Sequence, residues 1–295
     1  ISVYPRSKKY QRTTKYKQMK ESITSLQNPL VKEILGVQQK AARRKSSGIF
    51  VAEGRREVSL AMANGFVSQH LLVCRELFQD DPNYPVLVDD ATHNTVYVSR
   101  KVYNKLAYRE DAEGIMIVGS QKTHSLKRIR LSDNPMILVL EGIEKPGNLG
   151  AVLRTADAAG VDALLLCNAK TDLYNPNAIR ASMGCTFTVN VGICNTGEFI
   201  QWVTDSKLWK NRLPVVYATA LQNSTNYMDA VFHGPVILAF GEEAQGLSEE
   251  MRRVASKAIH IPMAGSIDSL NLAASLAILT FEAVRQRRTA QNDCR

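Results

Sequence analysis

The sequence predicts an α/β protein in two parts, a small α/β unit over residues 21–120 and a larger α/β unit over residues 135–295. In the larger unit, short apolar runs alternate with helical stretches, which is typical of a largely parallel sheet covered on both faces. In the smaller unit, the apolar runs are shorter and are separated by turn-forming residues. Residues 121–134 are basic and polar, and they predict a linker.

The smaller unit follows a basic segment at the start of the chain. Residues 1–20 hold seven Lys and Arg side chains and no acidic one, which predicts a disordered arm. Apolar residues at helical spacing predict helices over residues 29–37, 55–64 and 99–106, and Gly65 suits the end of the second helix. Strands are predicted over residues 48–52, 67–74, 86–88, 95–98 and 114–118.

The elements of the larger unit follow from the same two periodicities. Strands are predicted over residues 136–140, 163–167, 186–191, 215–220, 236–240 and 258–261. Helices are predicted over residues 150–159, 177–183, 199–207, 248–256 and 270–287. Gly160 and Gly184 follow two of these helices, as expected of residues that end a helix in the left-handed conformation.

The composition excludes several classes of protein. No apolar run reaches the roughly 18 residues that a membrane span needs, and residues 1–20 lack the apolar core of a signal peptide. The five cysteines and five histidines are scattered without metal-ligand spacing, so we expect no disulfide framework, no metal and a reducing, cytoplasmic location. The phosphate-binding and dinucleotide-binding glycine motifs of common nucleotide enzymes are also missing.

The charge of the chain is compatible with a polyanionic partner. The net charge is +9 and the pI is about 9.3. Lys and Arg side chains release condensed counterions when they neutralise phosphates, but a basic pI alone does not decide for nucleic acid. A local cluster is expected to contact RNA phosphates, although a solvated basic face is an equal alternative; it consists of Arg43, Arg44, Lys45, Arg55 and Arg56.

Three polar and glycine-containing clusters carry the functional signal. The first runs from Asn148 to Thr155 and overlaps a predicted turn over residues 146–150, which precedes the helix that holds Arg154. The second spans residues 240–248, and the third combines residues 261–263 with residues 269–275. Each cluster lies where an apolar run gives way to a turn or a helix. We therefore expect the three clusters to line one cleft.

In their order and spacing, these clusters resemble the signature of the SpoU (TrmH-like) branch of the SPOUT superfamily. Its members are RNA ribose 2′-O-methyltransferases that use S-adenosylmethionine. The resemblance covers residues 135–287 and implies a deep trefoil knot, a homodimer with cofactor sites near the subunit contact, and no metal. The smaller unit resembles, less closely, the substrate-binding domain found in many SpoU proteins, which looks like a ribosomal RNA-binding protein.

The resemblance also implies roles for individual residues. Those near the reacting ribose would be Asn148, Arg154, Glu243, Ser269 and Asn271. Those around the cofactor would be Ala220, Gly241, Ile261, Met263 and Leu270. Two positions depart from the pattern, because this chain has Glu242 where many relatives carry a small residue and Ala244 where many carry glycine.

The chemistry fits these residue types, although each has a structural alternative. A 2′-hydroxyl is scarcely ionised at neutral pH, so the enzyme must align the reacting atoms and help the proton to leave. A guanidinium has a pKa above about 12, so Arg154 suits orientation of a phosphate better than it suits a base. Taken alone, Arg154 is a solvated helix residue, Asn148 is a turn or cap residue, and Ser269 is a helix cap.

The resemblance therefore implies methyl transfer to a ribose 2′-hydroxyl of structured RNA, with ribosomal RNA favoured over transfer RNA. One alternative is a non-catalytic RNA-binding protein that keeps the fold. The presence of Arg154, Glu243 and Asn271 favours the enzyme. A methyltransferase that confers antibiotic resistance would share the chemistry and differ only in its target.

Overall fold

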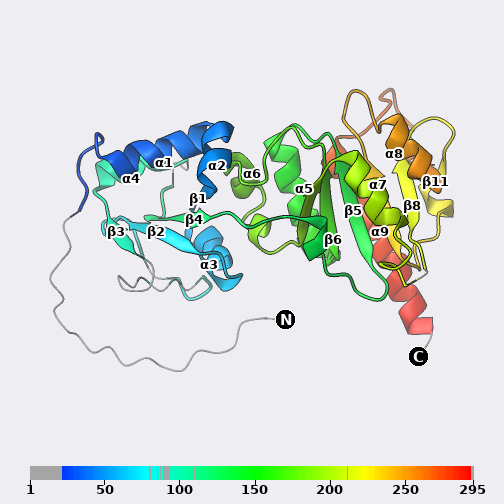
Figure 1. The fold of residues 1–295 in the computed structure, drawn as a ribbon, viewed down its shortest axis with the longest axis horizontal. Coiled ribbons are helices and arrows are strands. Elements are labelled where there is room, and N and C mark those ends of the chain that lie inside the picture. Colours follow the sequence, from blue (N-terminus) through cyan, green and yellow to red (C-terminus); the bar gives the residue numbers. More distant parts are fainter. Residues whose placement is uncertain are drawn as a thin grey trace.

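Two β-sheets, one on each side of the residue 121–134 segment, organise the chain (Figure 1). The computed structural model describes residues 22–79, 81–84, 86, 88, 94–108, 111–210 and 212–293, with only the backbone for residues 291–293. The predicted arm over residues 1–20 lies outside the described residues, and so does the middle of the predicted strand over residues 86–88.

The first sheet is mixed and has the strand order β1-β4-β2-β3. β4 pairs antiparallel with β1 and β2, and β3 pairs parallel with β2. Its strands are β1 (Ile49–Glu53), β2 (Ser68–Val73), β3 (Thr95–Tyr97) and β4 (Ile115–Ser120). Its helices are α1 (Pro29–Gln39), α2 (Ala41–Ser47), α3 (Arg55–Ala63) and α4 (Arg100–Leu106).

The helices of this sheet begin and end for local reasons. The Asn28 side chain accepts a hydrogen bond from the Leu30 N–H, and Pro29 occupies the first position of α1, where its missing N–H costs nothing. Gly48 ends α2 with φ +64°, a conformation that suits glycine. Side chains of β1 alternate between two cores, because Phe50 and Ala52 pack on the side of α3 whereas Ile49 and Val51 pack on the side of α1.

The second sheet is parallel throughout and has the order β7-β6-β5-β10-β8-β11-β9. Its strands are β5 (Met136–Glu141), β6 (Ala163–Cys167), β7 (Val191–Cys194), β8 (Val215–Thr219), β9 (Thr225–Asn226), β10 (Val236–Phe240) and β11 (Lys257–His260). The helices are α5 (Pro146–Ala159), α6 (Pro176–Ala181), α7 (Thr196–Thr204), α8 (Glu249–Val254) and α9 (Leu272–Asp293). Short 3-10 turns are η1 (Leu126–Arg128), η2 (Cys185–Phe187) and η3 (Tyr227–Asp229).

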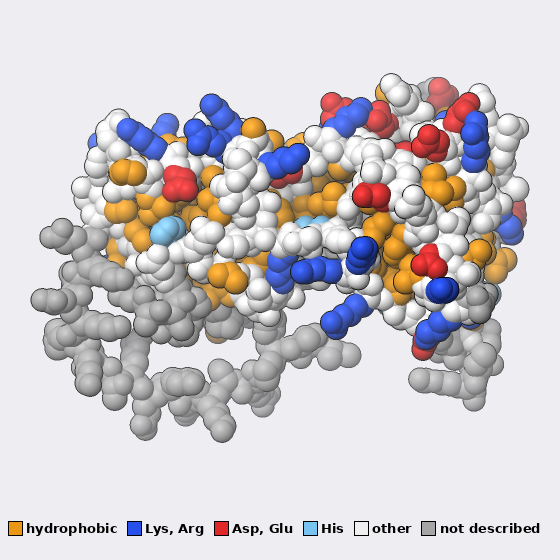
Figure 2. Space-filling view, viewed as in Figure 1, with side chains coloured by type: hydrophobic (Ala, Val, Ile, Leu, Met, Phe, Trp, Pro, Cys, Tyr) orange, Lys and Arg blue, Asp and Glu red, His pale blue; other side chains and the backbone are white. Residues whose placement is uncertain are grey.

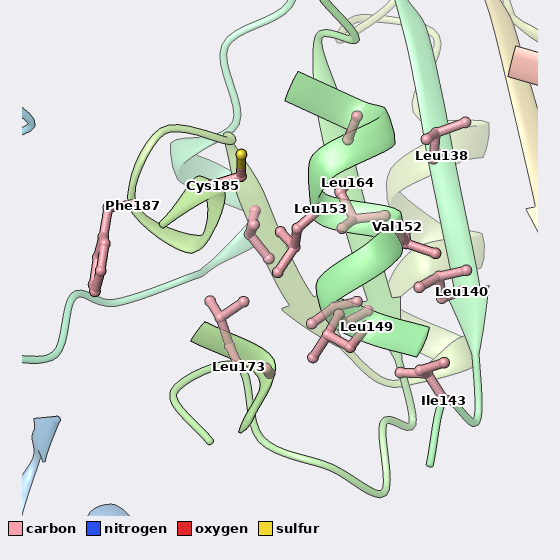
Figure 3. Packing of buried hydrophobic residues seen from close by; sticks show 14 of the residues in the cluster. Leu138, Leu140, Ile143, Leu149, Val152, Leu153, Leu164, Leu173, Cys185 and Phe187 are labelled. Atoms are coloured by element: carbon pink, nitrogen blue, oxygen red, sulfur yellow. The ribbon is translucent and has the colours of Figure 1, made fainter. Parts of the chain in front are cut away.

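Both faces of this sheet are covered, which explains its continuous apolar strands. Leu138 and Leu140 of β5 belong to the core on the side of α5 and α9, where Leu153 packs (Figure 3). Ile137 and Val139 of the same strand belong to the core on the side of α7 and α8. No helix in the described part of the chain is long and apolar enough to cross a membrane.

The strand order reverses at β5, and this reversal positions the site. From β5 the chain adds β6 and β7 on one side, and then β10, β8 and β11 on the other. In open parallel sheets, the loops after the two central strands diverge at such a switch point and leave a crevice outside the carboxyl ends of the strands. The crevice is therefore expected beyond Glu141 and Phe240.

Three predicted elements differ from the structure. The strand predicted over residues 186–191 is η2 followed by β7, because Cys185 and Phe187 bury their side chains in a turn rather than in the sheet. The turn predicted over residues 146–150 is the first turn of α5, with Pro146 at its first position. The predicted linker contains η1, and the short strand β9 was not predicted.

Aromatic side chains from the two sheets pack against each other. Phe50 stacks on Tyr174 with ring centroids 5.4 Å apart, and Phe187 lies 5.1 Å from Phe50 and 5.0 Å from Phe66. The Tyr174 hydroxyl is 2.7 Å from His124 Nε2, which ties the connecting segment to the same cluster. Burial lowers the pKa of His124, so the imidazole is neutral at neutral pH. The two sheets thus share one core.

Arg44 strengthens this contact, and its position contradicts the prediction that it contacts RNA. Its side chain is buried, because α2 turns this one residue inward. The guanidinium donates to the Asp172 carboxylate at 2.7 and 3.1 Å and to the carbonyl oxygens of Val37 and Gln38 at 2.7 and 2.9 Å. Arg44 therefore joins α2 to the loop between β6 and α6.

Asp172→Ala is expected to lower the free energy of unfolding by about 3 kcal/mol, because it leaves the Arg44 cation buried without its carboxylate. Chemical denaturation measures this change. Lys45→Ala, at an exposed neighbour on α2, should stay within about 0.5 kcal/mol of the wild type. Equal stability of the two variants would show that the pair does not hold the sheets together.

Candidate functional site

A cavity of about 440 Å³ lies beyond the carboxyl ends of β8, β10 and β11. It is lined by parts of four segments, over residues 219–221, 240–246, 259–263 and 268–279, and by Lys145. These segments follow three neighbouring parallel strands and open α9, so the cavity lies on the β10 side of the switch point, and of the loop after β5 only Lys145 lines it. Polar and apolar side chains share the lining, as in many small-molecule sites.

The structure gathers most of the sequence-predicted site residues here. All five residues assigned to the cofactor line the cavity: Ala220, Gly241, Ile261, Met263 and Leu270. Of the residues assigned to the ribose, Glu243, Ser269 and Asn271 line it as well. Asn148 reaches the same place through hydrogen bonds, whereas Arg154 does not line the cavity.

The loop after β10 is closed tightly upon itself. Glu242 N–H donates to the Gly246 carbonyl at 3.1 Å, and Gly246 N–H donates to the Glu242 carbonyl at 2.9 Å. A Cβ atom on Gly241 would lie 2.0 Å from the Gly246 carbonyl carbon and 2.2 Å from Leu247 N. Only glycine fits at position 241, because a Cβ atom would collide with the returning backbone of the loop, and Gly241 lines the cavity.

Side chains from all three sequence clusters meet at one edge of the cavity. The Glu243 carboxylate accepts hydrogen bonds from Lys145 Nζ and Asn148 Nδ2. Asn271 Nδ2 donates to Asn148 Oδ1 at 3.2 Å, and Asn271 Oδ1 accepts from the Ala273 N–H at 2.9 Å. Each amide thus donates on one side and accepts on the other, which fixes its orientation.

Lys145 is a site residue that the sequence reasoning missed. It directly precedes α5, and its ammonium group holds the pKa of Glu243 below its usual value, with Asn148 adding to the effect. Glu243 is therefore ionised at neutral pH. In the sequence, the only sign of this role is that Lys145 directly precedes Pro146, close to the first cluster. A lysine before a helix is usually solvated, so this position alone does not indicate a site residue.

Arg154 lies on another side of α5. Burial raises the pKa of Cys185 to about 11, and the nearby guanidinium groups of Arg56 and Arg154 oppose this rise. The Arg154 side chain is exposed and makes no hydrogen bond or ion pair with any described residue. It is therefore free to bind a ligand, but from outside the cavity.

The five predicted RNA contacts do not form one patch. Arg43 and Lys45 are exposed on α2, in the region where Lys and Arg side chains gather over α1 and α2 (Figure 2). Arg55 and Arg56 lie on α3, which covers the opposite face of the first sheet. Arg55 Nη1 donates to the Gln79 carbonyl at 2.9 Å, and Arg56 packs over the Tyr84 ring. With Arg44 buried, the prediction of a single patch is wrong.

No group of three or more His, Cys, Asp or Glu residues suited to hold a metal ion occurs within the described residues.

Comparison with known proteins gives two family matches. A model of the SpoU rRNA methylase family matches residues 135–281, and a model of the MRM3-like substrate binding domain matches residues 28–117.

Individual relatives extend over most of the chain. The 23S rRNA (guanosine-2′-O-)-methyltransferase RlmB of Photobacterium profundum is 30% identical, over 71% of this chain and 86% of its own. The 23S rRNA (uridine(2479)-2′-O)-methyltransferase of Streptomyces viridochromogenes is 29% identical, over 83% and 85%. The crystal structure of an AdoMet-bound rRNA methyltransferase from Sinorhizobium meliloti has a TM-score of 0.78 at 32% identity, over 90% and 97%.

Lys145→Ala is expected to raise the pKa of the Glu243 carboxyl toward its ordinary value of about 4.5. In the wild type the carboxylate stays ionised to a lower pH than in the variant. An NMR titration of carboxyl carbons, assigned with Glu243→Gln, measures the shift. Lys210→Ala, which removes a distant exposed partner of Asp133, should leave the Glu243 pKa unchanged. The same result for Lys145→Ala would refute the pairing.

Proposed function

We infer the function from one premise: this chain belongs to the SpoU rRNA methylase family. It is a methyltransferase that uses S-adenosylmethionine to methylate a ribose 2′-hydroxyl of ribosomal RNA. One observation carries this conclusion, namely that Asn148, Glu243 and Asn271, distant in sequence, form one hydrogen-bonded chain at the edge of the cavity. The two relatives described above act on guanosine and on uridine, so the similarity supports a common reaction and leaves the base open.

The cavity suits S-adenosylmethionine. Its volume of about 440 Å³ falls in the range of small-molecule sites, roughly 300–1,000 Å³. Ile261, Met263 and Leu270 offer apolar contacts for a flat base, and the backbone near Gly241 offers hydrogen-bonding groups that no side chain covers. We propose that these residues and Ala220 hold the cofactor.

When bound, the cofactor supplies an electrophilic methyl group on a sulfonium. The residues of this chain then align the ribose, and its 2′-hydroxyl proton passes to water. We propose that the amides of Asn148 and Asn271, together with the Ser269 hydroxyl, orient the ribose hydroxyls. The ionised Glu243 keeps the Asn148 amide in its donating orientation. Glu243 is a weak base because its pKa is lowered, so its role is to orient neighbouring groups.

We propose that Arg154 binds the RNA phosphate next to the target ribose, where its planar fork matches phosphate oxygens. Because Arg154 lies outside the cavity of its own chain, a homodimer in which one subunit presents it to the cavity of the other accounts for its position. Exposed apolar side chains support such a contact. Ile278 and Phe281 are 37% and 46% exposed on α9, the helix that packs against α5.

We propose that the smaller unit, residues 21–120, binds RNA and presents it to the larger unit. The match to a substrate-binding domain over residues 28–117 supports this role. Arg43 and Lys45 are our candidates for phosphate contacts, because both are exposed on α2. Phosphate contacts position RNA without reading its bases. On the family resemblance, we also propose the deep trefoil knot in the larger unit and a cytoplasmic location.

Mapping of 2′-O-methylation tests the function. The protein is incubated with S-adenosylmethionine and unmodified ribosomal or transfer RNA, and the methylated nucleotides are located. We expect one ribose of ribosomal RNA to be methylated. Methylation of transfer RNA alone would show that transfer RNA, and not ribosomal RNA, is the substrate. Cofactor binding without methylation of either RNA would favour the non-catalytic alternative.

Arg154→Ala is expected to lower the rate of methyl transfer by about 100-fold or more, because the variant loses a charged contact made to the reacting RNA. Arg154→Lys should also be slow, since an ammonium cannot reproduce the guanidinium fork. Single-turnover kinetics measure the rate, and calorimetry should show unchanged cofactor affinity. Turnover of the lysine variant near that of the wild type would contradict the role.

A further inference from the structure

A buried carboxylate lies behind the loop that lines the cofactor cavity. Glu141 is the last residue of β5, and 6% of its surface is exposed. Carboxylates are rarely buried to this extent without a cation, because loss of hydration is costly. None of the ion pairs among the described residues includes Glu141. Its polar contacts among the described residues are hydrogen bonds to neutral groups.

Three neutral donors provide that stabilisation. Glu141 Oε2 accepts from the Ser248 N–H at 2.8 Å. Glu141 Oε1 accepts from Ser248 Oγ at 2.8 Å and from Thr196 Oγ1 at 2.6 Å. Thr196 opens α7 and itself accepts from Asn168 Nδ2 at 2.8 Å, so its hydroxyl proton is directed at Glu141. The carboxylate at the end of β5 therefore joins the ends of the loops that follow two other strands, β7 and β10.

Ser248 connects the Glu141 carboxylate to the loop that lines the cavity. It is the residue before α8, and its hydroxyl oxygen accepts from the Met251 N–H at 3.2 Å. It also ends the loop that begins at Gly241 and contributes Glu242, Glu243 and Gly246 to the cavity lining. β10 fixes the start of the loop, and Glu141 fixes its end.

A second contact holds the same loop from the side. The Glu242 side chain lies over Gly142, where a Cβ atom would come within 2.4 Å of it. Its carboxylate pairs with Lys170 Nζ at 2.9 Å, and Lys170 follows β6. The glutamate that departs from the family pattern therefore fastens the loop to the neighbouring strand ends. This contact is more exposed than that of Glu141 and is expected to contribute less.

We propose that Glu141 is a positioning residue for cofactor binding: its carboxylate holds Ser248 and thereby fixes the shape of the loop over residues 241–247. Glu141 does not line the cavity, so it acts through the loop and not on the ligand. The inference rests on the proposed function for the identity of the ligand. The fixing of the loop itself does not depend on any ligand.

Glu141→Leu tests the proposal, because it leaves the Ser248 N–H buried without an acceptor. We expect S-adenosylhomocysteine to bind about 10-fold more weakly or worse in calorimetry. We also expect faster hydrogen exchange of the amides of residues 242–248, measured without ligand. Glu141→Gln keeps the size and one acceptor, so it should recover part of both properties.

A matched control separates positioning from general stability. Leu138→Ala removes a buried side chain from the same strand, in a different core cluster from Leu247 of the loop, and lowers the melting temperature. It should keep the cofactor affinity and the slow exchange of residues 242–248. If Glu141→Leu does not fold, Thr196→Val removes one of the three donors and should weaken binding several-fold, while Thr196→Ser should restore it.

Each outcome decides something different. Unchanged affinity and unchanged loop exchange in Glu141→Leu, or in Thr196→Val if that variant is used, would overturn the proposal. If Leu138→Ala weakens S-adenosylhomocysteine binding as much as Glu141→Leu does, the effect of Glu141 is one of general stability and not of positioning. If the wild type itself does not bind S-adenosylhomocysteine, the proposed function fails, whereas the exchange experiment still tests whether Glu141 holds the loop.

Discussion

The close approach of Gly241 to Gly246 and Leu247 is the constraint on which the site depends. The strand β10 ends at Phe240, and the chain then turns back to start α8. The loop between them folds upon itself without room for a side chain at position 241. This tight turn presents backbone to the cavity and places Glu243 at its edge. It also brings Ser248 down to Glu141. The cavity, the polar chain and the buried carboxylate all require this one path of the backbone.

The charges of the protein are divided between two places. Beside the cavity, Lys145 pairs with Glu243 and Lys170 with Glu242, whereas Asp268 lines the cavity and joins none of the ion pairs among the described residues. Unpaired cations such as Arg154 lie outside it, where a polyanion can reach them. This division suits a reaction between a small cationic cofactor and a large anionic substrate. The cavity lining carries more acidic than basic side chains, which suits a cationic cofactor, while exposed cations outside it attract and orient RNA.

Much of the fold was predictable from local pattern. The strands of the larger unit are buried on both faces, so their apolar runs identified β5, β6 and β10 to within a residue. The segment over residues 186–191 was predicted as a strand because it is apolar. Its Phe187 instead packs against Phe50 and Phe66, and such a long-range contact leaves no periodic pattern in the sequence. The start of α5 was placed too late because glycines at positions 147 and 150 suggested a turn.

The site was predictable where the family pattern reaches and not beyond it. The residues assigned to the cofactor all line the cavity because the pattern marks strand ends, and strand ends meet at one edge of a parallel sheet. Arg44 was misassigned because its sequence neighbours are exposed cations, and only the tertiary fold turns it toward Asp172. Lys145 and Glu141 were missed for a related reason. Their partners lie 55 to 107 residues away in the sequence, and neither residue has a specific local signal.

The central claim is that the backbone path at Gly241 forms the cofactor site. The most direct measurement is calorimetric binding of S-adenosylmethionine to Gly241→Ala beside Gly147→Ala, with melting temperatures recorded for both. A Cβ atom at Gly147 meets no atom within 4 Å, so this helical substitution is a matched control. We predict that Gly147→Ala binds like the wild type and that folded Gly241→Ala shows no binding. Wild-type affinity in folded Gly241→Ala would contradict the account.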